Sequence, residues 1–148
     1  KIPFILDWID LQSKVLNKYK WGGTLGPDFD CSGLIQVAFM RQEIFIPRDS
    51  YQIMRFCRHL FNFPGPMDQL KMGDLLFFGD NNVCNHVAIY SHEGYYYHSS
   101  GIEFGRDGIY KERLYESEYD DNTSNYYRSK LISAGRVTRS YLWNKPLR

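Results

Sequence analysis

The chain has 148 residues, 43% of them hydrophobic and 24% charged, and its net charge is +1. This length suits a single domain over residues 1–148 that buries its own core without disulfides or a structural metal. The near-neutral charge excludes the basic field typical of nucleic-acid binding, and no apolar run approaches the roughly 18 residues of a membrane span.

Three helical patterns occupy the first part of the chain. The apolar spacing predicts an amphipathic helix over residues 3–18. Residues 21–27 are rich in glycine and end in proline, so we expect a loop there. A dense apolar pattern then predicts a buried central helix over residues 31–42, with Asp30 as its cap. A third helix is predicted to run from about residue 50 to residue 60.

The second part of the chain has the pattern of strands. Short β-branched or aromatic runs bounded by turn residues predict strands over 74–79, 86–90 and 95–98. Residues 103–130 are polar and are expected to form a long surface excursion, and residues 135–141 are expected to form a closing strand. Helices followed by an antiparallel meander indicate an α+β fold, with the helices packed on one sheet.

The three cysteines are too few and too irregularly spaced for a disulfide scaffold or a zinc knuckle. Cys57 is expected to be a small buried side chain in the third helix. Cys31 would begin the central helix, where the positive end of the helix dipole favours a thiolate. Cys84 stands two residues before His86 and would share its strand face, but it lacks a helix dipole. Cys31 is therefore the better candidate nucleophile.

Two histidines fall on neighbouring predicted strands that a short turn connects. Facing side chains in such a pair lie about 4.5–5.5 Å apart at Cβ, so His86 and His98 can share a hydrogen bond. One ring would take the thiol proton of Cys31 while the other holds the first ring in place. The same three residues offer too few ligands for a zinc site, so we expect no metal. His59 and His92 lack such neighbours and are expected to be solvated.

The motifs, in this order and spacing, resemble the NlpC-type family of bacterial cell-wall cysteine peptidases, whose compact fold is papain-like. The resemblance covers nearly the whole chain and rests on residues 19–24, 29–33, 46–52, 70–78, 86–90 and 98–101. Residues 98–109 and 134–137 are similar to a subgroup that includes cyanobacterial enzymes. Members of that subgroup carry an N-terminal Src-homology-type domain, which would precede Lys1.

The resemblance implies catalytic roles for four residues. It makes Cys31 the nucleophile, His86 the general base and then the acid, and His98 the orienting third member. Tyr19 would lie beside the nucleophile and help to polarise the carbonyl. No metal or organic cofactor is implied.

The resemblance also implies a set of substrate-binding residues. Asp30, Ser32 and Ser50 match positions that bind polar ends of the substrate in members that trim stem peptides. Helix capping is an alternative role for Asp30 and Ser50, and solvation of the first turn is an alternative for Ser32. Arg48 would pair either with a substrate carboxylate or with a surface acid.

The implied substrate is a murein stem peptide, L-alanyl-γ-D-glutamyl-diamino acid, cut between D-glutamate and the diamino acid. Another thiol amidase or acyltransferase on the same fold, or a module that binds murein peptides without cutting them, is an alternative. We expect a monomer, and reduced-thiol chemistry favours the cytoplasm over the periplasm or secretion. The start at Lys1 rather than Met suggests a trimmed domain.

Overall fold

The computed structural model describes residues 1–140 and, for the backbone alone, residues 145–146. Its main feature is a six-stranded antiparallel sheet in the order β3-β8-β4-β5-β6-β7. The six strands are β3 (Arg58–Asn62), β4 (Leu75–Asp80), β5 (Val83–Tyr90), β6 (Tyr95–Ser100), β7 (Gly108–Arg113) and β8 (Leu131–Arg136).

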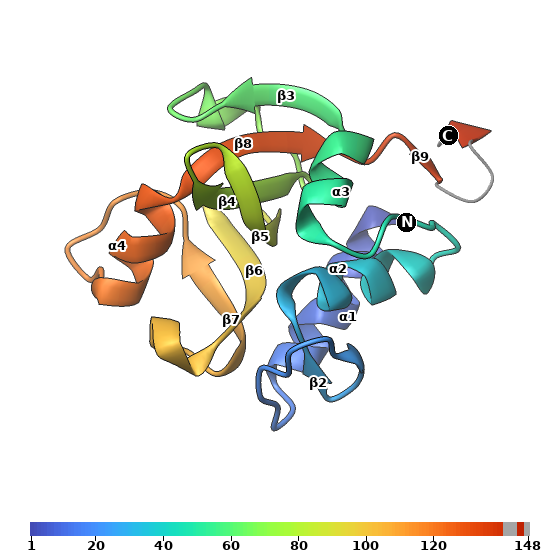
Figure 1. The fold of residues 1–148 in the computed structure, drawn as a ribbon, viewed down its shortest axis with the longest axis horizontal. Helices are drawn as coiled ribbons and strands as arrows, with labels where there is room; N and C mark the ends of the chain where they lie inside the picture. Colours follow the sequence, from blue (N-terminus) through green and yellow to red (C-terminus); the bar gives the residue numbers. More distant parts are fainter. Residues whose placement is uncertain (141–144, 147–148) are drawn as a thin grey trace.

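Helices lie on both sides of this sheet, which confirms the α+β class. In Figure 1, three helices group on one side of the strands and the fourth lies on the other. They are α1 (Ile2–Ser13), α2 (Cys31–Met40), α3 (Ser50–Phe56) and α4 (Asn122–Ser129). The minor elements are β1 (Thr24–Leu25), β2 (Asp28–Phe29), β9 (Arg139–Ser140), β10 (Lys145–Pro146), η1 (Met67–Gln69) and η2 (Ile102–Phe104).

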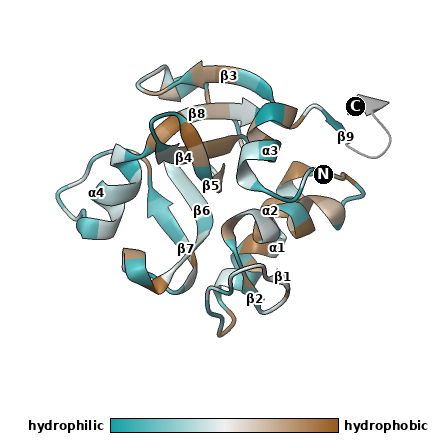
Figure 2. Ribbon diagram, in the orientation of Figure 1, coloured by the Kyte–Doolittle hydropathy of each residue, from teal (hydrophilic) through white to brown (hydrophobic). Residues whose placement is uncertain are grey.

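Two hydrophobic clusters fill the two faces of the sheet. On one face, Phe77 and Val87 pack with side chains of α1, α2 and α3. On the other face, Phe78 and Tyr96 pack with Tyr127 of α4. The strands alternate in this way because successive side chains point to opposite faces. Figure 2 shows the hydrophobic residues gathered on β4 and β5 at the middle of the fold.

The first and third helices are shorter than the sequence pattern predicts. α1 ends at Ser13, and the side chain of Asn17 donates a hydrogen bond to the carbonyl oxygen of Gln12 at this end of the helix. The helix predicted to reach residue 60 stops at Phe56, and the chain continues directly into β3, which pairs with β8. Cys57 is buried as expected, but it follows α3 rather than lying inside the helix.

The prediction of a surface excursion over residues 103–130 is wrong. This stretch contains β7, which pairs with β6, and α4, whose Tyr127 is buried. The stretch is mostly polar, so the sequence pattern does not reveal its few buried apolar side chains, which include Ile109 and Leu114. The closing strand begins earlier than expected, at Leu131, and residue 141 of the predicted strand lies outside the described residues.

A bulge in β5 separates two side chains that were expected to share a strand face. His86 lies opposite Phe78, but Cys84 lies opposite the next residue, Gly79, so Asn85 is the extra residue. Cys84 consequently belongs to the cluster on the α3 side, whereas His86 contacts Phe78 on the other face. The expected shared face for Cys84 and His86 is therefore wrong.

Across the described residues, every helix is too short or too polar to cross a bilayer.

We expect Phe77→Ala to lower the free energy of unfolding by about 3–5 kcal/mol, because it empties a fully enclosed part of the core. The ring of Phe77 is 1% exposed. The control is Leu16→Ala at a side chain that is 90% exposed, which should change stability by less than about 0.5 kcal/mol. Urea unfolding followed by circular dichroism measures both, and equal effects would contradict the assigned core.

Candidate active site

The start of α2 is fixed by the carboxylate of Asp30. One oxygen accepts the N–H of Gly33 at 2.6 Å, and the other accepts the N–H of Gly22 at 3.0 Å. A Cβ on Gly33 would lie 2.1 Å from the carbonyl oxygen of Gly23, so only glycine lets the helix and the preceding loop come this close. Cys31 is thereby held as the first residue of the helix, and the predicted cap is confirmed.

A cavity of ≈ 270 Å³ opens at this helix end and brings together three of the predicted catalytic residues: Cys31, His86 and Tyr19. Cys31 and His86 are only 7% and 8% exposed. The remaining wall contains aromatic rings and two charged side chains, namely Trp21, Phe78, Phe104, Tyr126, Tyr127, Glu103 and Lys130. A thiol, an imidazole and a phenol therefore face one small space.

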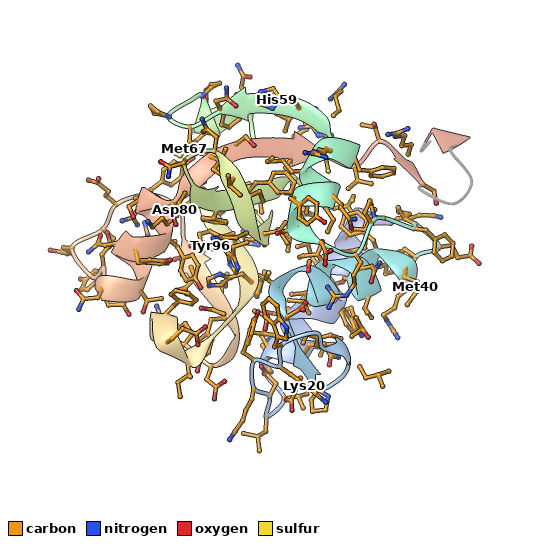
Figure 3. The ribbon with its side chains drawn as sticks, in the orientation of Figure 1. Lys20, Met40, His59, Met67, Asp80 and Tyr96 are labelled. Carbon is orange, nitrogen blue, oxygen red and sulfur yellow. The ribbon has the colours of Figure 1, made fainter. Side chains whose placement is uncertain are left out.

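His98 lies behind His86 and is completely buried. Its Nδ1 is 2.8 Å from Nε2 of His86, so the hydrogen bond expected between the two rings is present. Tyr96, labelled in Figure 3, packs edge-on against the ring of His98. Because Nε2 of His86 faces His98, only Nδ1 of His86 is left to meet a thiol proton.

The row of hydrogen bonds continues to two residues that the sequence reasoning missed. Nε2 of His98 lies 2.9 Å from Oε2 of Glu112 on β7. Arg106 donates to both carboxylate oxygens of Glu112, through Nε at 2.9 Å and Nη2 at 2.8 Å. One signal could have located the acid, because Glu112 stands two residues before the apolar Leu114, the spacing of side chains on one face of an extended chain.

Burial opposes the acidification that was expected for Cys31 at the helix start. Burial raises the pKa of Cys31 to about 11, although the backbone N–H groups of Val87 and Ser32 act in the opposite direction. Burial, and then the neighbouring His98, lower the pKa of His86 well below its ordinary value. Both shifts favour the uncharged thiol and imidazole over a thiolate–imidazolium pair.

Three of the predicted substrate-binding residues form a cluster beside the helix start, outside the cavity wall. Arg48 donates to Asp30 at 2.7 Å and to the hydroxyl of Ser32 at 2.8 Å. Its partner is therefore the buried helix cap rather than a surface acid. Since Asp30 already accepts two N–H groups and a guanidinium, its oxygens are occupied.

Ser50 is buried at the first position of α3, and it also lies outside the cavity wall. It does not cap that helix, because Asp49 is the cap and the side chain of Gln52 accepts the N–H of Asp49 at 3.2 Å. A hydrogen bond from Ser50 instead reaches Cys84, which does not line the cavity either.

His59 and His92 are exposed, as expected. Within the described residues, no group of three or more His, Cys, Asp or Glu side chains is arranged to hold a metal ion.

Comparison with known proteins identifies relatives of this chain. A sequence profile of the NlpC/P60 family matches residues 16–136. The Bifunctional muramidase/DL-endopeptidase CwlT of Bacillus subtilis is 32% identical over 126 residues, which cover 80% of this chain and 32% of that protein. The Gamma-D-glutamyl-L-lysine dipeptidyl-peptidase of the same organism is 36% identical over 84 residues, 55% of this chain and 27% of that protein. The chain thus spans about a third or less of these curated relatives.

Solved structures have the same architecture. An NlpC/P60 family protein from Bacillus cereus has a TM-score of 0.72 and 25% identity, and the match covers 93% of this chain and 40% of that chain. The peptidoglycan hydrolase RipB of Mycobacterium tuberculosis has a TM-score of 0.66 at 24% identity, over 95% of this chain and 65% of that chain. The latter match is a likeness of fold.

We expect iodoacetamide to alkylate Cys31 slowly at neutral pH and faster as the pH approaches 11, because only the thiolate reacts and burial keeps the thiol protonated. Mass spectrometry of the Cys31 peptide over a pH series gives the rate. Cys57, whose pKa burial raises to about 12, serves as an internal control and should react more slowly. A rate for Cys31 that is already maximal below pH 7 would contradict this effect of burial.

Proposed function

The chain belongs to the NlpC/P60 family, and on that premise we propose that it is a cysteine endopeptidase acting on murein stem peptides. The bond proposed to be cut joins the γ-carboxyl of D-glutamate to the diamino acid that follows it. One observation carries the proposal. Cys31, at a capped helix start, faces the same cavity as His86, whose other nitrogen is held by His98.

The names of two relatives support the proposed bond. One is called a Gamma-D-glutamyl-L-lysine dipeptidyl-peptidase, and lysine, like diaminopimelate, is a diamino acid. The other is called a DL-endopeptidase. Because this chain spans only a part of each, the substrate of the whole protein is itself a proposal. We further propose a monomer that recycles released peptides in the cytoplasm, where thiols stay reduced.

The proposed reaction follows the geometry of the cavity. His86 accepts the thiol proton on Nδ1 as Cys31 attacks the γ-carbonyl carbon, and the carbonyl oxygen becomes an oxyanion. Backbone N–H groups in the first turn of α2 and the phenol of Tyr19 stabilise that charge. His86 then gives its proton to the leaving amine, and a thioester remains on Cys31. Water, deprotonated by His86, hydrolyses the thioester and releases the free thiol.

The charges around the cavity fit a peptide that carries both carboxylates and amines. Lys130 lines the cavity and pairs with Asp80. Glu103 lines it too and has no hydrogen bond or ion pair within residues 1–140, so we propose it as the partner of a substrate amine. Arg48 is 31% exposed while it holds Asp30, and it is the member of the predicted substrate-binding set that a substrate carboxylate could reach. Ser32 and Ser50 are buried outside the cavity wall, so no direct contact with that carboxylate is proposed for them.

We expect reduced protein to cut synthetic L-Ala-γ-D-Glu-meso-diaminopimelate into L-Ala-D-Glu and diaminopimelate at neutral pH. Cys31→Ala should abolish cleavage because no other side chain in the cavity replaces the nucleophile. Cys84→Ala is the matched control and should retain cleavage, since Cys84 does not line the cavity. Chromatography with mass detection measures the products. Intact peptide with the unaltered protein, or full activity in Cys31→Ala, would contradict the proposal.

We expect Glu103→Gln to raise KM roughly tenfold for a peptide with free amines, since losing about 1.4 kcal/mol of binding weakens affinity by that factor. The control is the same peptide with its amines acetylated, for which the two proteins should have equal KM values. Initial rates over a series of peptide concentrations give both numbers. An equal KM for the free-amine peptide would remove Glu103 from the proposed site.

A further inference from the structure

We propose that Glu112 and Arg106 are positioning residues that fix the tautomers of His98 and His86, and thereby leave Nδ1 of His86 free to accept the thiol proton. The inference rests on the proposed chemistry of Cys31 and His86, but its principal test needs no substrate. It gives a function to the stretch of chain that the sequence alone presents as a surface excursion.

The hydrogen bonds of Glu112 require an ionised carboxylate. Arg106 can only donate, and its Nε and Nη2 occupy Oε2 and Oε1 of Glu112 at 2.9 and 2.8 Å. Oε2 is also 2.9 Å from Nε2 of His98. Burial alone would raise the pKa of Glu112, but the hydrogen bonds from His98 and Arg106 keep it below its ordinary value. The carboxylate is therefore an acceptor towards His98.

The carboxylate of Glu112 fixes the tautomer of His98, and His98 in turn fixes the tautomer of His86. His98 must carry its proton on Nε2, where it donates to Glu112. A neutral imidazole has one N–H, so Nδ1 of His98 is an acceptor, and the nitrogen 2.8 Å away, Nε2 of His86, must donate to it. His86 then has its lone pair on Nδ1. The direction of every hydrogen bond in the row is thus set at the end far from the cavity.

The same row stabilises the charge that forms during catalysis. When His86 takes the thiol proton on Nδ1 it becomes a cation, and its Nε2–H already points along the row towards Glu112. Burial lowers the pKa of His98, and the hydrogen bond and the charge of Glu112 act against that shift. The other titratable or charged groups around His98 and Glu112 are Tyr96 on β6, Tyr127 and Arg128 on α4, and Asp121 at the start of α4.

Arg106 is itself held between two elements. Its Nη1 donates to Asp121 at 2.9 Å, and Asp121 caps α4 by accepting the N–H of Ser124. The guanidinium is 17% exposed, whereas the carboxyl of Glu112 is 4% exposed. Arg106 therefore lies nearer to the solvent than Glu112 does. We expect a substitution of Arg106 to leave the packing around His98 intact.

The first experiment compares Glu112→Gln with the unaltered protein by long-range ¹H–¹⁵N correlation spectra of the histidine rings. In the unaltered protein, His86 and His98 should both be protonated on Nε2 from pH 6 to pH 8, and the exposed His59 and His92 provide reference signals. In Glu112→Gln the amide can donate to His98, so at least one of the two buried rings should change tautomer. The ratio kcat/KM should fall through kcat, by up to about 10⁴-fold, the loss that a wrong tautomer causes in a catalytic triad.

The matched control is Asp74→Asn, which alters another buried carboxylate held by an arginine fork. Arg136 donates to Asp74 at 2.6 and 2.8 Å, in a position away from the cavity. This variant should lose thermal stability but retain both Nε2–H tautomers and the pH profile of kcat/KM. A change of histidine tautomer in Asp74→Asn would show a general loss of packing and would overturn the assignment.

A second pair of variants keeps the test decisive if Glu112→Gln does not fold. In Arg106→Gln, burial should raise the pKa of Glu112, so the acid limb of the kcat/KM profile should move to higher pH. Glu112→Asp keeps the negative charge and should retain the tautomers and most of the profile. Unchanged tautomers in Glu112→Gln, or an unmoved acid limb in Arg106→Gln, would overturn the proposal. If the peptide is not cut at all, the spectra still decide this inference, and only the proposed substrate is lost.

Discussion

The carboxylate of Asp30 is the contact on which the geometry of the site depends. It joins three separate parts of the chain: the loop at Gly22, the first turn of α2 at Gly33, and Arg48 before α3. The direction of α2 and the place of its first side chain follow from these bonds. A charged group with little exposure is stable here because donors surround it. Because the oxygens of Asp30 are already occupied by these donors, a substrate amine would have to pair with a different carboxylate.

The cavity lies where two packing layers meet. Cys31 belongs to the cluster of the N-terminal helices, while His86 contacts rings of the opposite cluster around Phe78 and Tyr127. β5 and β6 pair only at Ile89–Tyr97 and Tyr90–Tyr96. Beyond that short ladder the sheet no longer separates the two layers, so a thiol from one side can reach an imidazole on the other.

Much of this arrangement is visible in the sequence, and the misses have physical causes. The central helix and its cap follow from Asp30, the glycine at position 33 and a dense apolar run, all of which act locally. The nearness of the two histidines follows from their places on consecutive strands joined by a short turn, although the β5–β6 ladder ends at Ile89–Tyr97 before it reaches either of them. Glu112 was missed because the few buried residues of the stretch 103–130 are outnumbered by polar ones, so no strand pattern stands out there. The side taken by Cys84 depends on a bulge that no pattern marks, and the raised pKa of Cys31 depends on enclosure, which only the folded chain supplies.

The enclosed thiol has a consequence for the lifetime of the protein. Peroxides convert thiolates to sulfenic acid and onward to irreversible products far more readily than they attack a protonated sulfur. Because Cys31 is 7% exposed and burial raises the pKa of its thiol to about 11, we expect it to react slowly with such oxidants. In the proposed reaction the thiolate forms only when a substrate carbonyl lies beside Cys31 and His86 takes its proton. Oxidation of the empty site would therefore be slow, while catalysis would begin once the cavity is filled.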